Sequence, residues 1–157
     1  MRLFRGKTKI MYWKGDTARE VRDGGVVILT DSGTVAPVRN DSSNDRLIGV
    51  ARRNDTVTDS LMVPVEVPVE SAVEWLASTD SDGGAADSDV SRLVTIDTTG
   101  GNSVNAGDSC GLNVDVSDSS AAAGPAASFA ITGIVSATQV IGVLAHTMWH
   151  QTYDTAA

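Results

Sequence analysis

The segment LMVPVEVPVE at residues 61–70 constrains the fold more than any other stretch of this chain. Its valines alternate strictly with prolines and glutamates, which places the valines on one face of a β-strand and the other residues on the opposite face. Proline has no N–H to donate, so Pro64 and Pro68 remove donors from one edge of this strand and leave the valine-parity edge intact. The pattern therefore predicts a strand that pairs on one side and resists edge-to-edge association on the other.

Short stretches of similar character recur along the chain, separated by turns rich in Gly, Asn, Asp and Ser. Residues 71–77 fit either a helical turn, because Ser71 and Glu74 match a capping box, or another strand. The expected fold class is mainly β, a small β-barrel or β-sandwich of short antiparallel strands with an extended N-terminal arm. Besides the strand at 61–70, strands are predicted at 26–30, 34–38, 46–53, 91–98 and 112–118, and a hairpin at 128–135 and 138–148.

Charge is distributed unevenly along the chain. Residues 1–22 carry seven basic and two acidic side chains, a net charge of +5, so the rest carries −13 of the total of −8. We therefore divide the chain into a basic extended arm at 1–24, a β-rich domain at 25–150 and a flexible tail at 151–157. The arm predicts docking on an acidic protein partner rather than on nucleic acid, whose phosphates would repel the acidic body. A solvated first strand explains the same charge pattern.

The acidic composition also bears on the environment of the protein. Sixteen of the twenty acidic residues are Asp, only three of the twelve basic residues are Lys, and aromatic residues make up 4%. This composition resembles that of proteins from extreme halophiles, in which crowded carboxylates keep the surface hydrated in concentrated salt. An ordinary acidic mesophilic protein is the alternative. The longest apolar stretch, at 128–149, is interrupted by Gly, Ser, Thr and Gln, so we expect a hairpin there and no membrane span.

Three motifs invite a chemical interpretation, and each lacks an essential part. GDSCG at 107–111 resembles the surroundings of a nucleophilic serine, but both histidines of the chain follow it and Cys110 replaces a glycine. HTMWH at 146–150 spaces two histidines like metal ligands, but no glutamate follows the first. DSDGGAADSD at 80–89 offers oxygen ligands for Ca²⁺ without EF-hand spacing, and a solvated acidic loop explains it equally. We therefore expect no enzymatic activity, no cofactor and no metal site.

Three segments resemble structural proteins of tailed viruses, including those that infect haloarchaea. They are SGTVAPVRNDSSNDRLIGVA at 32–51, TDSLMVPVEVPVESAVEW at 58–75 and SFAITGIVSATQVIGVL at 128–144. The resemblance implies a capsid decoration, or cementing, protein: a small β-domain, commonly a homotrimer, that binds the major capsid protein on the outer surface of the virion and stabilises the shell. A turret, vertex or head–tail component is an alternative, and a cellular β-barrel ligand-binding module is another.

The family offers no motif that can be transferred residue by residue, so candidate interface residues are assigned from charge and pattern. For contact with the capsid protein, the residues of the arm are Arg2, Arg5, Lys7, Lys9, Tyr12, Trp13 and Lys14. For the oligomer contact, or edge strand, they are Val63, Val65, Val67 and Val69.

Overall fold

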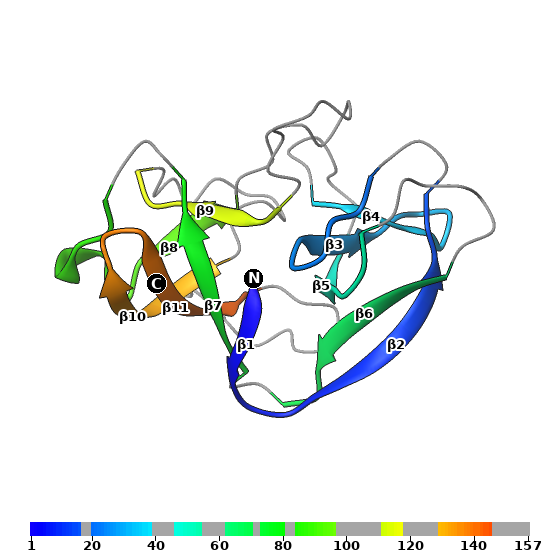
Figure 1. Ribbon diagram of the computed structural model, residues 1–157, viewed down its shortest axis with the longest axis horizontal. Coiled ribbons are helices and arrows are strands. Elements are labelled where there is room, and N and C mark those ends of the chain that lie inside the picture. Colours follow the sequence, from blue (N-terminus) through cyan, green and yellow to red (C-terminus); the bar gives the residue numbers. More distant parts are fainter. Residues whose placement is uncertain are drawn as a thin grey trace.

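The chain folds into two adjoining β-sheets (Figure 1). A computed structural model describes residues 1–16, 20–38, 46–54, 62–70, 73–80, 84–96, 111–117 and 129–145. Within these residues the regular structure consists of strands and one short 3₁₀-helix, η1 (Asp87–Asp89). The prediction of a mainly β protein with a small barrel is confirmed. The described part of the chain contains no helix that is long and apolar enough to span a membrane.

The first sheet contains a closed barrel. Its strand order is β1-β7-β11-β10-β8-β9, and the barrel closes because β9 also pairs in parallel with the end of β7, Ser78 opposite Asn113. The beginning of β7 is paired instead with β1, in antiparallel orientation. The strands are β1 (Arg2–Arg5), β7 (Glu74–Thr79), β8 (Leu93–Ile96), β9 (Asn113–Asp115), β10 (Phe129–Ser136) and β11 (Gln139–Leu144).

The second sheet curls until its two outer strands touch at one end. Its order is β2-β6-β5-β3-β4, and all neighbouring strands are antiparallel. Gly15, directly after β2, forms a parallel bridge with Val35 of β4, and the Asp16 N–H donates to the Val35 carbonyl at 2.9 Å. The strands are β2 (Thr8–Lys14), β3 (Val26–Leu29), β4 (Val35–Pro37), β5 (Arg46–Ala51) and β6 (Met62–Pro68).

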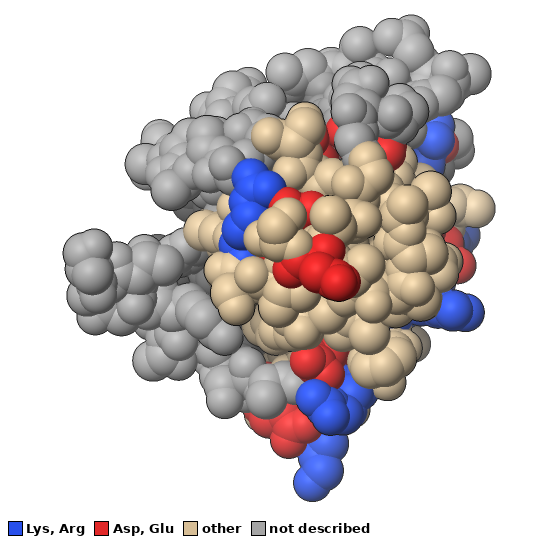
Figure 2. All heavy atoms as spheres, turned by 90° about the vertical axis from the view of Figure 1, so that its left-hand side faces the viewer, with Lys and Arg blue, Asp and Glu red and all other residues tan. Residues whose placement is uncertain are grey.

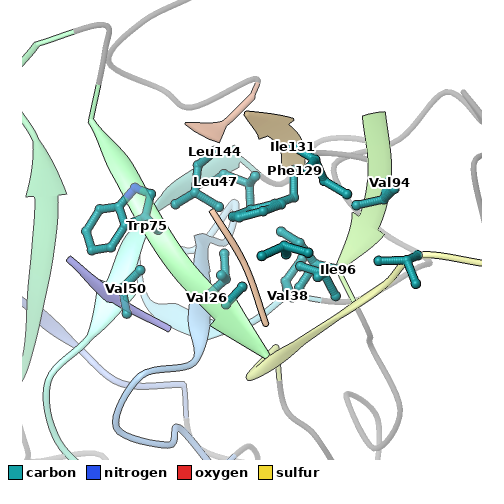
Figure 3. Close-up of a cluster of buried hydrophobic side chains, with 14 of the residues drawn as sticks. Val26, Val38, Leu47, Val50, Trp75, Val94, Ile96, Phe129, Ile131 and Leu144 are labelled. Atoms are coloured by element: carbon teal, nitrogen blue, oxygen red, sulfur yellow. The ribbon is translucent and has the colours of Figure 1, made fainter. Parts of the chain in front are cut away.

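Two hydrophobic clusters stabilise this arrangement. The larger cluster joins the interior of the first barrel to one face of β3, β4 and β5, with Phe129 in its middle and Trp75 at one side (Figure 3). The smaller cluster fills the curl of the second sheet and includes Val27, Ile48 and Val65. Strands β3 to β5 are thus buried on both faces, which explains why VVIL and LIGVA are continuous apolar runs rather than alternating ones.

The predicted division into an arm and a separate body is wrong for residues 2–14. These residues form β1 and β2, and β2 pairs with β6 over its whole length, from Thr8 opposite Pro68 to Lys14 opposite Met62. Met11 and Trp13 also pack against the smaller cluster, so the burial of apolar side chains and a complete ladder hold this segment in the fold. The predicted tail at 151–157 lies outside the described residues.

The prediction that 61–70 forms an edge strand is wrong, although its parity argument holds. The Arg52 N–H donates to the Pro64 carbonyl at 2.9 Å, so the proline-parity edge of β6 faces β5. The register on that side covers only Val50 opposite Glu66 and Ala51 opposite Val65, whereas the valine-parity edge pairs fully with β2. The prolines therefore shorten one ladder instead of leaving the edge open.

The valine face of β6 belongs to the core of this chain. Val63, Val65 and Val67 are all 0% exposed within the smaller cluster, so they cannot form the predicted contact between subunits. Val69 follows the strand and is 44% exposed. Of the two alternatives for 71–77, the structure shows the strand for residues 74–77, which belong to β7, while residues 71–72 lie outside the described residues.

Candidate partner-binding site

Two ribbons of chain cross from one sheet to the other at a shared corner. Residues 2–14 lead from β1 to β2, and beside them lie β6 and β7 within the described residues 62–70 and 73–79, which we call the β6–β7 ribbon. Gly6 lies at the corner with φ +112°, and a Cβ there would come within 2.9 Å of the Val73 Cα. Only glycine therefore allows the basic segment to turn this closely against its neighbour. The Val69 N–H donates to the Lys7 carbonyl at 3.1 Å just beyond the corner.

Three of the four glutamates of the chain lie on the β6–β7 ribbon and contact the basic segment. The Thr8 hydroxyl donates to Glu66 at 2.6 Å, and the Lys7 N–H donates to Glu70 at 2.7 Å. The Arg5 guanidinium pairs with Glu74 at 2.7 Å. Figure 2 shows basic and acidic side chains together at the lower end of the molecule, where Figure 1 places this corner. The basic segment, for which an acidic partner protein was predicted, thus already contacts acidic side chains of its own chain.

Arg52, which the sequence analysis did not select, connects the two sheets. Its Nε donates to Glu66 at 2.5 Å, and its Nη2 makes a further close contact with the same carboxylate. Its Nη1 donates to the Met1 carbonyl at 3.1 Å, and the guanidinium carbon lies 5.9 Å from the centroid of the Trp75 ring. The side chains of Arg52 and Glu66 are 24% and 12% exposed, so this pair is largely withdrawn from solvent.

Met1 lies between the two sheets (Figure 1), and its ammonium group donates to the Gly24 carbonyl. The pKa of this ammonium is lowered to about 6, first by burial and then by the nearby charge of Arg52, while Asp23 opposes the shift. An adjoining open cavity of about 330 Å³ is lined by Met1, Arg52, Ser78 and Gln139 among others. The Met1 ammonium and the Arg52 guanidinium already make hydrogen bonds within the chain. Their presence beside this cavity is therefore explained by their structural role.

The outward face of β2 carries two of the exposed apolar side chains of the basic segment, and β1 carries two others, Leu3 and Phe4. Ile10 is 47% and Tyr12 is 62% exposed, and Met62 of β6, opposite Lys14, is 50% exposed. We call these four residues, Ile10, Tyr12, Lys14 and Met62, the β2 outer face. Clusters of exposed apolar residues with a charged rim are typical of interaction sites. Ile10 and Met62 were not predicted for this site. Ile10 lies two residues before Tyr12, so a strand at residues 8–14 would have placed both on one face, whereas nothing local connects Met62 to them.

The predicted contact residues are only partly brought together. Tyr12 and Lys14 share the outer face, whereas Trp13 points to the opposite side and is half-buried against the smaller cluster. Arg2 and Arg5 are exposed on β1, and Lys7 and Lys9 are exposed at the start of the second sheet. The contact residues predicted from the sequence therefore include residues from both faces of β2.

The structure gives little support for a chemical role of the three motifs discussed above. Asp89 of the acidic segment accepts the Ala86 N–H at 2.9 Å and pairs with Arg92. These two hydrogen bonds, that from Ala86 first, lower the pKa of its carboxyl group, which indicates a role in holding η1. Among the residues that the structure describes, no three His, Cys, Asp or Glu side chains are grouped as metal ligands. Asp82, residues 107–110 and residues 146–150 lie outside the described residues.

The chain thus belongs to the class of all-β proteins, and its candidate site is an exposed strand that carries both apolar and basic side chains. In comparisons with known proteins, no family model, no curated protein and no solved structure matches the chain. Its function is therefore inferred from the molecule itself.

Proposed function

We propose that this chain is a capsid decoration protein of a tailed virus, which binds the outside of the assembled head and stabilises it. The observation that carries the proposal is the β2 outer face, where Ile10, Tyr12 and Met62 are all about half exposed or more beside Lys14. Such a face suits a protein that works by being held on a larger surface. The resemblance at 32–51, 58–75 and 128–144 supports it, and these segments contribute adjoining strands of both sheets.

Decoration stabilises a shell by linkage. A protein that binds the assembled lattice but not its dissociated subunits adds a free energy of RT ln(1 + [L]/Kd) for every occupied site. Many modest contacts then act together. A rigid body is an advantage in this role, because little conformational entropy is lost when a preorganised strand binds.

Self-association into a homotrimer belongs to the proposal as well. Because Val63, Val65 and Val67 are buried, the contact between copies has to use exposed side chains. We assign this contact to two exposed apolar residues outside the basic segment, Val69 on the turn after β6 and Val135 on β10, which are 44% and 53% exposed.

The first test is the ratio of this chain to the major capsid protein in purified virions, measured by quantitative mass spectrometry. A ratio near one to one, or one trimer for each local three-fold position, supports decoration. A few copies per hundred capsid proteins would instead assign the chain to a turret, vertex or head–tail position. Absence from particles would refute a virion role and favour the cellular binding module.

The second test compares variants that differ in one surface. Replacing Ile10 and Tyr12 together by serine removes two of the three apolar side chains of the β2 outer face without touching either core cluster. We expect this double variant to fold and to lose binding to heads that lack the protein. Val90→Ser, which changes an exposed apolar residue directly after η1, outside the β2 outer face and outside the proposed contact between copies, is the matched control and should bind like the wild type. Equal binding by both variants would contradict the assignment of this face.

A further inference from the structure

The free edge of β2 has a defined set of donors. In an antiparallel strand, the N–H and C=O of one residue point to the same side, and successive residues alternate. Since the Val69 N–H donates to the Lys7 carbonyl, the odd-numbered residues of this strand face β6. The main-chain groups of Thr8, Ile10 and Tyr12 therefore point to the opposite side. The Asp16 N–H confirms this parity, because it donates to Val35 on that opposite side.

Within the described part of the chain, no strand pairs with β2 on this side between Thr8 and Tyr12. In Figure 1, β2 forms the outer border of the molecule beside β6. The exposure of Ile10 and Tyr12 agrees with an open edge. The edge is thus a row of three donors and three acceptors with its apolar side chains in solvent, which is the arrangement to which a further strand can be added.

The other outer strand of this sheet is less suitable. The N–H of Val38, directly after β4, donates to the Val26 carbonyl of β3, so Val35 and Pro37 point their main-chain groups away from β3. Proline cannot donate, so Pro37 removes one donor from that edge, while β2 retains all of its donors. Of the two outer edges of the second sheet, β2 is the one equipped to bind a strand.

Charge identifies what this edge can bind. The three lysines of the chain, Lys7, Lys9 and Lys14, flank the edge and are all exposed. Lysines on an edge strand oppose pairing with another basic strand, so two copies of β2 would repel each other when placed edge to edge. An acidic strand would instead be attracted by the same lysine charges.

We propose that the free edge of β2 binds an extended, acidic segment of a partner protein by strand addition. Main-chain hydrogen bonds to Thr8, Ile10 and Tyr12 supply the register, the lysines select acidic side chains, and Ile10 and Tyr12 contact alternate residues of the added strand. The inference rests on the proposed function for the identity of the partner, a capsid protein, but its test does not require capsids.

The test uses two blocked eight-residue peptides, one alternating valine with aspartate and the other alternating valine with lysine. Hydrogen exchange of single amides is followed by NMR at 0.1 M salt, where the Debye length is about 10 Å. At saturation with the aspartate peptide, exchange at Ile10 and Tyr12 should slow at least tenfold. Exchange at Met11, whose N–H already faces β6, should not change. The lysine peptide should have no effect at the same concentration.

Two substitutions at one position separate the main chain from the side chain. Ile10→Pro removes an edge donor that makes no bond within the described residues, whereas Ile10→Ala keeps the N–H and loses only apolar contact. Ile10→Pro should weaken binding of the aspartate peptide about tenfold more than Ile10→Ala, as expected for one main-chain hydrogen bond. Should Ile10→Pro fail to fold, the exchange measurement on the wild type decides the question alone.

Three results would overturn the inference. They are no slowing at millimolar aspartate peptide, equal slowing by both peptides, and protection of Ile10 and Tyr12 in the free protein. If that protection rises with protein concentration, the edge binds a second copy, and if it does not, the edge is covered by the chain itself. None of these results changes the ratio measured in virions, so failure of this inference and failure of the decoration proposal can be told apart.

Discussion

Replacing Arg52 by alanine tests whether one side chain holds the two sheets together. Arg52 pairs with Glu66, donates to the Met1 carbonyl and lies over the Trp75 ring. Its removal leaves the Glu66 carboxylate, which is 12% exposed, with only the Thr8 hydroxyl as a hydrogen-bond donor among the described contacts. The variant should therefore lose more free energy of unfolding than a surface ion pair would.

The expected loss can be estimated from the parts. Breaking a fully buried ion pair costs about 3–5 kcal/mol and an exposed one about 0–1 kcal/mol, so this pair, with its arginine 24% exposed, should cost about 2 kcal/mol. The contact with Trp75 adds about 0.5–1 kcal/mol. The hydrogen bond to Met1 adds about 1 kcal/mol. We expect a total near 3–4 kcal/mol, a large part of the stability of a domain of this size.

The assay is urea unfolding followed by tryptophan fluorescence, with the free energy of unfolding compared at an unchanged m value. Arg5→Ala is the matched control, because Arg5 also pairs with a glutamate of the β6–β7 ribbon but its side chain is 74% exposed. It should cost less than about 1 kcal/mol. Equal losses for the two variants, or a loss below 1 kcal/mol for Arg52→Ala, would refute the reasoning.

Three further outcomes follow from burial and close packing. Gly142→Ala should destabilise the protein by about 3 kcal/mol in thermal unfolding, because a Cβ there would lie 2.3 Å from a ring carbon of Phe129. At Gly133 the nearest atom to such a Cβ is 3.9 Å away, so Gly133→Ala should be nearly neutral in the same assay. Because burial holds the Met1 ammonium at a pKa of about 6 against 8.0 when unfolded, the unfolded state binds more protons between these values. The free energy of unfolding should therefore fall by up to about 2–3 kcal/mol as pH drops from 8 to 6, and a fall of the same size in N-terminally acetylated protein would contradict this cause. Val65→Ala should cost about 2 kcal/mol and Val69→Ala less than about 0.5 kcal/mol in urea unfolding, and equal losses would contradict the placement of the valine face in the core.

The strands were predictable from the sequence because their signals are local. Alternation and turn residues predicted β3, β4 and their connection, and the strict period of 61–70 predicted β6. Which strands become neighbours depends on closure of each sheet, and no local signal specifies it. The parity of Pro64 correctly indicated a weakened edge, but whether that edge is open depends on β5, which the segment itself does not encode.

The site was predictable in charge but not in geometry. The excess of basic residues at 1–22 marked the right segment, but net charge does not distinguish an extended arm from an outer strand. Its acidic counterpart was visible as the regular spacing of Glu66, Glu70 and Glu74, which nothing in the local sequence ties to residues 5–8. Arg52 was missed because its importance comes from three contacts that are distant in sequence.

The crossing of the two ribbons has a consequence for how the chain acquires its structure during synthesis. β1 and β2 leave the ribosome before their partners, β7 and β6, with which they pair from Glu74 opposite Arg5 to Met62 opposite Lys14. Neither ladder can form until all of the chain between its two strands has been translated, and contacts so distant in sequence form slowly. Until then the nascent segment exposes Ile10, Met11 and Trp13 with both of its edges unpaired, a state that invites aggregation. The lysines and arginines of this segment keep it soluble until β6 and β7 have been synthesised. They therefore act before the chain has folded as well as after.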